Sequence, residues 1–293
     1  KCFLHLNEVI FFLLTLLYFF IINTNEVIFK DPEFEAFFKQ YGYVAVPLIS
    51  QEALSEVLNL YESSRDDSGL DSNFYTSIWS DNRAYKEQVD RELKRILKPF
   101  LEKHFKTYQT AFANFMVKKS GYSSSLQPHQ DWTFVKEPEN YSITVWIPLM
   151  DVTEENGALE VLPGSNNLDN YVRARFMNSP FSAHNKFIEE HLMKSIPLKK
   201  GEALLVNSRT IHASPDNLSG VDRVAASIVV YPESTSLLHY VSEKGQELTV
   251  DALDIDASFF VKYSCFENPS DEKAVTKVNI EAREVSLEKL KNL

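Results

Sequence analysis

Apolar residues between positions 31 and 105 recur at the three- and four-residue spacing of amphipathic helices. Asp31 and Pro32 supply an N-cap and a proline at the first helical position, so a first helix is predicted there. Ser50 caps a second, which carries its apolar residues on one face. A third, long helix is predicted over about residues 83–105, and Pro99 is expected to end or kink it.

From position 110 the pattern changes to the short apolar runs and alternation of β-strands. Strands are predicted at 43–46, 111–117, 141–149, 159–162, 203–206, 224–231 and, as an edge strand, 237–241; residues 285–293 are predicted to form a terminal strand or helix. Glycines that follow Asn156, Pro163 and Lys200 supply turns between them. Helices followed by many short strands predict an α+β fold, with N-terminal helices packed outside a closed or sandwiched β core.

Residues 165–199 lack a clear period and form too long a connection for an ordinary turn. Long connections of this kind in compact domains are commonly lids or binding loops, so this segment is a predicted lid. No linker rich in proline, glycine or serine divides the chain. Residues 31–293 are therefore expected to form a single domain.

Residues 1–30 are a hydrophobic N-terminal extension with an apolar run at 9–22. This run is shorter than the roughly 20 residues that span a bilayer, and no small-x-small cleavage site follows it. The chain begins with Lys1, and the sequence NEVIF at 7–11 recurs at 25–29. Three interpretations stay open: an extension without function, such as an overextended gene model or the edge of a fragment; a membrane anchor or uncleaved signal; and a cleaved signal.

The formal net charge of −11 gives a nucleic-acid partner little electrostatic support. Cys2 and Cys265 lie far apart, which indicates neither a disulfide framework nor a zinc cluster and favours a reducing compartment. A cytoplasmic location is expected, with membrane anchoring as the alternative if residues 9–22 are a genuine anchor. A small-molecule substrate is the expected partner, and the pattern does not predict an oligomeric state.

Histidine and carboxylate side chains occur at the spacing of a metal site. His129 and Asp131 are one residue apart and would share a face on an extended strand. His212 follows the predicted strand at 203–206, and a second imidazole would complete a 2-His-1-carboxylate triad for Fe(II). Arg223 opens the next strand, and its planar guanidinium suits bidentate pairing with the carboxylate of a keto acid.

Four sequence segments extend this motif. They are HQDW at 129–132, SITVWIPLMDV at 142–152, NGALEVLPGS at 156–165 and HASPDNLSGVDR at 212–223. In order and spacing they resemble the phytanoyl-CoA dioxygenase family of Fe(II)/2-oxoglutarate-dependent oxygenases, and the resemblance covers roughly residues 34–232. It implies a double-stranded β-helix, a jelly-roll or cupin-like core.

The resemblance also implies a cofactor set and the residues that hold it. Fe(II) would be bound by His129, Asp131 and His212, and the distal carboxylate of 2-oxoglutarate by Arg223. Trp146 would line the co-substrate pocket together with Met116 or Phe115. Dioxygen would be the oxidant, with ascorbate in support. Some halogenating relatives replace the carboxylate ligand by a small residue, so the presence of Asp131 favours hydroxylation.

Several alternatives remain at this level. The two histidines could be satisfied core residues, Asp131 a turn residue and Arg223 a structural ion-pair partner. A non-catalytic cupin-like binding module, or a family member that carries out desaturation or epoxidation, would show the same motif. A cluster of four cations could bind an anionic substrate, although solvated surface charge is the preferred interpretation: Lys118, Lys119, Arg173 and Arg175. The substrate, a small organic or lipid-like molecule, is not identified.

Overall fold

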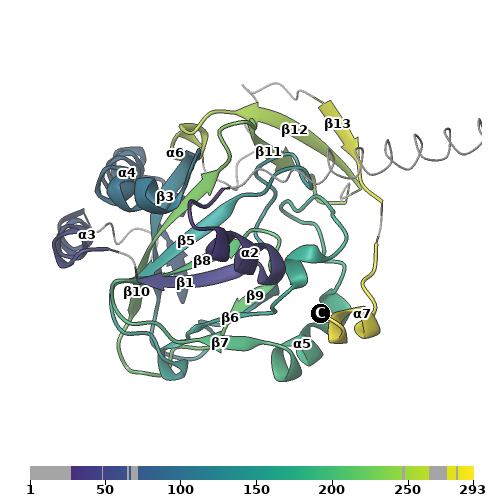
Figure 1. Ribbon diagram of the computed structural model, residues 1–293, viewed down its shortest axis with the longest axis horizontal. Coiled ribbons are helices and arrows are strands. Elements are labelled where there is room, and N and C mark those ends of the chain that lie inside the picture. The colour runs from purple at the N-terminus through teal and green to yellow at the C-terminus, as the bar shows by residue number, and fades with distance from the viewer. Residues whose placement is uncertain are drawn as a thin grey trace, which may run out of the picture.

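The computed structural model contains two antiparallel sheets that face each other (Figure 1). Residues of both sheets line one cavity. The structure describes residues 28–47, 49–64, 66, 72–245, 248–263, 276–281 and 283–293. The larger sheet has six strands in the order β1-β8-β5-β10-β3-β2, and the smaller has four in the order β4-β9-β6-β7. A separate three-stranded sheet, β11-β12-β13, lies near the end of the chain.

The strands of the larger sheet are β1 (Tyr43–Pro47), β2 (Phe74–Thr76), β3 (Gln109–Lys118), β5 (Ile143–Pro148), β8 (Glu202–Asn207) and β10 (Arg223–Tyr231). Those of the smaller sheet are β4 (Leu126–His129), β6 (Leu159–Val161), β7 (Lys194–Ile196) and β9 (His212–Ser214). The third sheet comprises β11 (Leu237–Val241), β12 (Thr249–Ile255) and β13 (Thr276–Asn279). The predicted strands at 43–46, 111–117, 203–206, 224–231 and 237–241 are confirmed, and the last lies at a sheet edge as expected.

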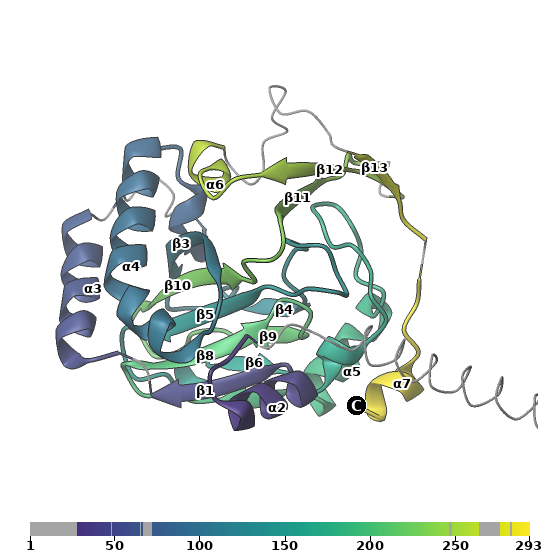
Figure 2. The ribbon, with the colours of Figure 1, turned by 45° about the horizontal axis from the view of Figure 1, so that its top comes forward.

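Three helices precede most of the strands: α2 (Pro32–Tyr41), α3 (Gln51–Ser64) and α4 (Arg83–His104). Figure 2 shows α3 and α4 side by side on the outside of the larger sheet. Apolar residues at helical spacing on α4, such as Val89, Leu93 and Leu97, pack into one core with Phe115 and Ile228 from the sheet. The helices therefore cover the outer face of the larger sheet, and the inner face of the sheet lines the cavity. The prediction of helices outside a β core is therefore confirmed.

The helix caps predicted at Asp31 and Ser50 form in the structure. The Asp31 side chain accepts hydrogen bonds from the backbone N–H groups of Glu33 and Phe34, and Ser50 accepts one from Ala53. Pro99 lies inside α4, which continues to His104, so of the two predicted outcomes the helix end is excluded and the kink stays a prediction. The apolar face of α4 is buried on both sides of Pro99, and that burial outweighs the loss of one backbone donor.

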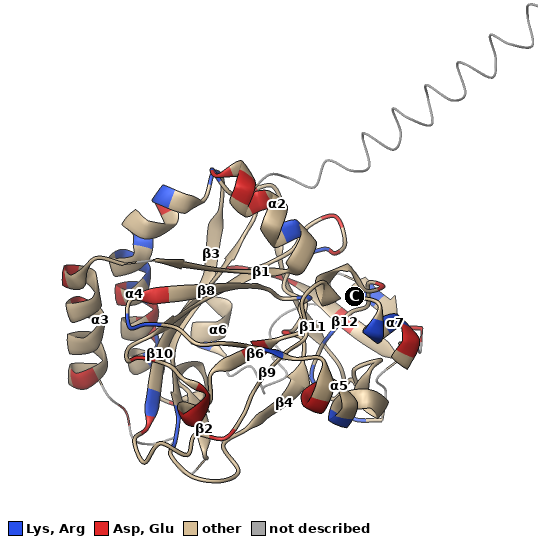
Figure 3. Ribbon diagram, turned by 60° about the horizontal axis from the view of Figure 1, so that its bottom comes forward, with Lys and Arg blue, Asp and Glu red and all other residues tan. Residues whose placement is uncertain are grey.

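The remaining helices are α5 (Asn185–His191), α6 (Phe259–Lys262) and α7 (Leu287–Lys291). Figure 3 shows charged positions gathered on α3, α4, α5 and α7, which face outward from the sheets. The segment 165–199 contains α5 and β7, and β7 pairs with β6 in the smaller sheet. Its action as a lid stays a prediction.

The apolar run at 9–22, like the rest of residues 1–27, lies outside the described residues. Within the part of the chain that the structure describes, no helix combines the length and the hydropathy needed to span a membrane.

Strand register fixes which side chains share the cavity. On β10, Ser227 is the direct partner of Asn114 on β3 and of Trp146 on β5. Arg223 and Ala225, at even separations from Ser227, pair with Lys118 and Met116 in the same way. Because side chains alternate along a strand, these residues project to the same face of the sheet.

Candidate metal and co-substrate site

His129, Asp131 and His212 come together where the two strands β4 and β9 pair. His129 ends β4 and is the register partner of His212, the first residue of β9. Asp131 lies just beyond the end of β4, and its Oδ1 is 3.7 Å from Nε2 of His212. One ligand atom from each residue lies within 4.8 Å of the other two. This arrangement suits a facial metal site, although the carboxylate comes from the loop after the strand.

Both imidazoles are oriented by the backbone two residues before them. His129 Nδ1 contacts the carbonyl oxygen of Gln127 at 2.7 Å, and His212 Nδ1 contacts that of Thr210 at 3.0 Å. A carbonyl oxygen only accepts, so each Nδ1 carries a proton, and Nε2 is the ring nitrogen that each histidine can offer to a metal. Desolvation, followed by the neighbouring His212 ring, lowers the pKa of His129 to about 4. His129 is therefore neutral at pH 7, which is its metal-binding form.

The Asp131 carboxylate is fixed from the opposite wall of the cavity. Thr144, on β5, donates a hydrogen bond of 2.8 Å to Asp131 Oδ2, which leaves Oδ1 directed toward His212. Sequence reasoning missed Thr144. Its spacing of two residues from Trp146 on one strand was a usable signal, because such residues share a face.

Arg223 is buried at the start of β10 and has unused hydrogen-bonding capacity. It donates to the carbonyl oxygen of Gly157, its Nε atom has no hydrogen-bond partner, and its guanidinium lies over the Trp146 ring at 5.1 Å. Burial lowers the pKa of Arg223 to about 10, so it stays charged at pH 7. Among the described residues no acidic side chain forms an ion pair with it. The geometry therefore offers a buried cation to an anionic ligand.

Gly157 is needed for this contact. Its φ is +77°, and a Cβ at this position would lie 2.6 Å from the carbonyl oxygen of Pro215. Only glycine adopts such a backbone at low cost, and its carbonyl can then approach Arg223.

Lys118 lies beside Arg223 and is fully buried, so the preferred interpretation of solvated surface charge is wrong for it. Its amine donates to the carbonyl oxygens of Ser214 and Pro215. Desolvation, with a further contribution from Arg223, lowers the pKa of Lys118 to about 7. The same correction applies to Arg173, which is also buried.

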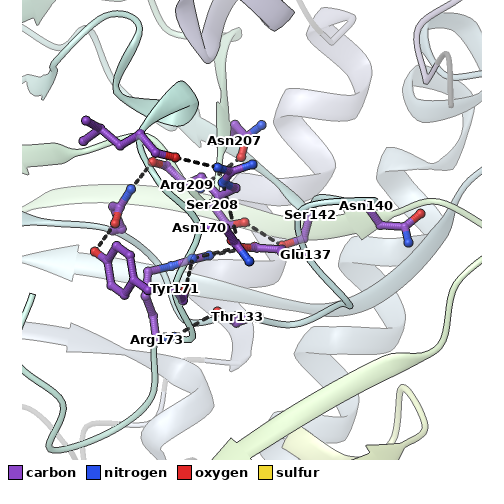
Figure 4. Close-up of polar contacts among 12 residues, drawn as sticks. Thr133, Glu137, Asn140, Ser142, Asn170, Tyr171, Arg173, Asn207, Ser208 and Arg209 are labelled. Atoms are coloured by element: carbon purple, nitrogen blue, oxygen red, sulfur yellow. Dashed lines mark hydrogen bonds and ion pairs between the residues drawn. The ribbon is translucent and has the colours of Figure 1, made fainter. Parts of the chain in front are cut away.

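Arg173 is the centre of a polar network between the segment 165–199 and the loop that carries Glu137 (Figure 4), and it also contacts Asp131 of the candidate metal site. Its guanidinium forms a bidentate pair with Glu137 at 2.7 and 2.8 Å, and its Nε donates to the backbone carbonyl of Asp131 at 2.6 Å. Tyr171 donates to Gln130, whose amide in turn donates to the carbonyl of Arg209. The chain on both sides of Asp131 is thus held by this segment. Arg173 and Glu137 lie on separate loops, and no local pattern in the sequence connects them.

The cavity beside the site has a volume of about 320 Å³, and its lining includes both the polar residues of the site and a set of aromatic residues. His129, Asp131, His212, Thr144 and Arg223 lie along it. Its aromatic lining residues come from five separated regions of the chain: Phe74, Trp79, Phe112, Trp132, Phe134, Trp146 and Phe260. All three tryptophans of the chain are among them.

The family is decided by sequence comparison. The model of the family described as Phytanoyl-CoA dioxygenase (PhyH) matches residues 51–225, more than half of the chain. The chain belongs to the phytanoyl-CoA dioxygenase family. Phytanoyl-CoA dioxygenase domain-containing protein 1 from Danio rerio is 33% identical over 118 residues, which cover 37% of this chain and 40% of that relative. Phytanoyl-CoA dioxygenase 1 from Oryza sativa subsp. japonica is 31% identical over 120 residues, covering 40% and 42%. The matched regions span about two fifths of these relatives.

A solved structure extends the likeness of this phytanoyl-CoA dioxygenase family chain to the fold. The epimerase SnoN, in complex with Fe3+, alpha ketoglutarate and nogalamycin RO, aligns with a TM-score of 0.53 and 17% identity, covering 88% of this chain and 98% of that one. At that identity the likeness concerns the fold alone. It joins the chain to the jelly-roll fold of non-haem iron oxygenases.

The structure brings together most of the residues that the family resemblance singled out. The three predicted metal ligands, Arg223, Trp146 and Met116 all line the one cavity. Phe115 does not, because it projects from the opposite face of β3 into the core beneath the helices. Of the two alternatives on β3, Met116 lines the cavity and Phe115 does not.

Proposed function

We propose that this chain is a non-haem Fe(II)- and 2-oxoglutarate-dependent dioxygenase that hydroxylates a small organic or lipid-like substrate. The observation that carries the proposal is the meeting of two free imidazole Nε2 atoms and one carboxylate oxygen within 4.8 Å, beside a buried arginine without an acidic partner among the described residues. Family membership supports the same reading. The two facing antiparallel sheets are proposed to be the halves of a double-stranded β-helix.

The donor set fits ferrous iron. Two neutral imidazoles and one carboxylate form the facial triad that binds Fe(II) and leaves coordination positions open. Contacts to Gln127 and Thr210 orient the two rings, and Thr144 orients the carboxylate, as outer partners of metal ligands commonly do. His129, Asp131 and His212 would hold the metal.

The surroundings of Arg223 fit the distal carboxylate of 2-oxoglutarate. A carboxylate there would satisfy the buried Nε and compensate a cation that lies away from water. Trp146 and Met116 would form the walls along the carbon chain of the co-substrate.

When bound, iron with 2-oxoglutarate and dioxygen supplies an oxidation that releases succinate and carbon dioxide and removes a hydrogen atom from the substrate. The protein's contribution is to place one carbon of the substrate next to this centre and to exclude water with the aromatic walls. Asp131 occupies the position that halogenating relatives leave to chloride, so oxygen insertion is favoured.

Succinate release from purified protein with Fe(II), 2-oxoglutarate and ascorbate tests the proposal, scored across a panel of lipophilic alcohols, acids and acyl thioesters. At least one compound is expected to raise succinate release and to gain one oxygen atom. His129→Ala and Asp131→Ala should abolish the coupled release, whereas His191→Ala, which removes an exposed imidazole, should leave it unchanged.

Other outcomes would select the alternatives. If the two ligand variants leave coupled succinate release unchanged, the site assignment is wrong. A protein that binds neither Fe(II) nor 2-oxoglutarate would be a non-catalytic module of the same fold. A product that has lost two hydrogens would indicate desaturation, and this would overturn hydroxylation while retaining the iron and 2-oxoglutarate site.

A further inference from the structure

Two of the residues that line the cavity each carry a buried polar atom without a hydrogen-bond partner. The atoms are Oδ1 of Asn114, a residue that is 2% exposed, and Oγ of Ser227, a residue that is 1% exposed. The two residues are direct partners across β3 and β10. Leaving such atoms unpaired costs on the order of 1–3 kcal/mol each, so a pair of them at one place in a cavity indicates a ligand group.

The pair lies between the co-substrate end of the cavity and its aromatic end. Along β3 the cavity-facing residues run from Met116 through Asn114 to Phe112, and along β10 they run from Arg223 to Ser227. Ser227 is four residues from Arg223, about 13 Å along a strand. The co-substrate is proposed to occupy the part of the cavity between Arg223 and the metal triad. The part of the cavity beside Asn114 and Ser227 is then available to the substrate.

The hydrogen-bonding capacity of the pair is defined. The Asn114 amide nitrogen donates to Thr76 Oγ1 at 2.7 Å, which leaves Oδ1, an acceptor, as the side-chain atom without a partner. The Ser227 hydroxyl can donate as well as accept. A hydroxyl group on a ligand would satisfy both, because it can donate to Asn114 and accept from Ser227.

The rest of the substrate region favours an uncharged carbon skeleton. The charged or titratable residues that line the cavity are His129, Asp131, His212 and Arg223, and all four are committed to the proposed metal and co-substrate. Beyond Asn114 and Ser227 the lining is formed by Ile78, Trp79, Phe112, Phe134, Val229 and Phe260. A charged group buried there would lack a counterion within the lining.

We propose that Asn114 and Ser227 form a subsite for a hydroxyl group carried on an apolar, ring-sized carbon skeleton, and that they fix which carbon of the substrate faces the metal. The role in positioning the reacting carbon rests on the proposed dioxygenase function. The binding preference does not, and it can be measured on its own.

A matched pair of probes tests the subsite: 2-indanol, and indane, which lacks the hydroxyl. Each is titrated calorimetrically into the whole chain, once with Mn(II) and 2-oxoglutarate and once without them. Wild-type protein is expected to bind 2-indanol about five- to tenfold more tightly than indane, the effect of one or two added hydrogen bonds. Tryptophan fluorescence provides a second readout, because all three tryptophans line the cavity.

Two variants remove the subsite without adding charge. Ser227→Ala and Asn114→Leu should bring the ratio of the two affinities close to one, chiefly by weakening 2-indanol. Ser142→Ala is the control, because it removes a buried serine hydroxyl that bonds Ser208 outside the cavity lining, and it should retain the wild-type ratio. If Asn114→Leu does not fold, Ser227→Ala alone carries the test.

Equal affinity of wild-type protein for the two probes, or no binding of either, would overturn the subsite. So would variants that keep the wild-type ratio, including the case in which they weaken only 2-oxoglutarate, since the pair would then serve the co-substrate. A preserved preference for 2-indanol in a protein that binds neither metal nor 2-oxoglutarate would contradict the dioxygenase function and retain the subsite.

Discussion

Thr144 determines how the Asp131 carboxylate is presented, because its hydroxyl holds Oδ2 at 2.8 Å and leaves Oδ1 on the side of His212. Thr144→Val keeps the shape of the side chain and removes this hydrogen bond. The affinity for Mn(II) or Fe(II), measured calorimetrically without oxygen, is expected to fall about 10- to 100-fold, as for other groups that orient metal ligands. Thr249→Val, which changes an exposed threonine at the start of β12 in the third sheet, is the matched control. Equal metal affinity of the two variants would show that Thr144 does not orient the ligand.

Lys118 gives a dependence of stability on pH. Its pKa is about 7 in the folded chain and 10.5 for the free amine, so between these values the unfolded chain holds a proton that the folded chain has released. The contribution of Lys118 to the free energy of unfolding therefore rises with pH, by up to about 1.4 kcal/mol per unit. Urea unfolding between about pH 7.5 and about pH 9 should show a smaller increase for Lys118→Met than for wild type. Lys98→Met, on the exposed face of α4, should keep the wild-type slope. Parallel slopes for wild type and Lys118→Met would contradict the assignment.

At the scale of the structural elements, the buried ion pair of Arg173 and Glu137 fixes the position of the segment 165–199. Arg173→Met would leave Glu137 buried with only Arg209, 3.9 Å away, as a cation, and would remove the bond to the Asp131 carbonyl. The free energy of unfolding is expected to fall by about 3 kcal/mol, and metal affinity should fall with it. Lys289→Met breaks an exposed ion pair with Asp169 in the same segment, and should cost less than about 1 kcal/mol. Similar unfolding midpoints for the two variants would refute this role.

The helices and long strands could be predicted from sequence because their signals are local. The caps at Asp31 and Ser50 and the apolar alternation of β3 and β10 required no knowledge of distant residues. The strands that the pattern missed, such as β4 and β9, are three or four residues long and depend on pairing between distant parts of the chain: β4 pairs with β9, and β9 also pairs with β6. Pro99 shows the reverse case, in which the burial of a long helical face overrides a local signal.

At the scale of the whole molecule, the residues of the site come from distant parts of the chain, so a ligand that contacts them all stabilises the folded state. A ligand that binds only the folded state stabilises it by about 2.7 kcal/mol at 100 times its dissociation constant. Mn(II) with 2-oxoglutarate is therefore expected to raise the melting temperature by roughly 5 °C or more, and EDTA should reverse the shift. Asp131→Ala should show no comparable rise. An equal rise in that variant would place the ligands elsewhere.

The candidate site could be predicted only as far as one motif and a family resemblance reach. His129, Asp131, His212 and Arg223 have side chains whose chemistry is specific enough to suggest an iron and keto-acid site. Asn114 and Ser227, by contrast, are ordinary polar residues in apolar strands, and their meaning comes from the register that places them opposite each other in the cavity. That register depends on the packing of the whole sheet.

His129, Asp131 and His212 are proposed to hold the metal, and Arg223 is proposed to receive the co-substrate. Calorimetric titration of 2-oxoglutarate into Mn(II)-loaded protein without oxygen tests this assignment most directly. Saturable 1:1 binding is expected for wild type, with none for metal-free protein or Asp131→Ala and strong weakening for Arg223→Met. Arg175→Met, which removes an arginine outside the cavity lining, should bind like wild type. Metal-independent binding of 2-oxoglutarate, or undiminished binding by Arg223→Met, would contradict the account.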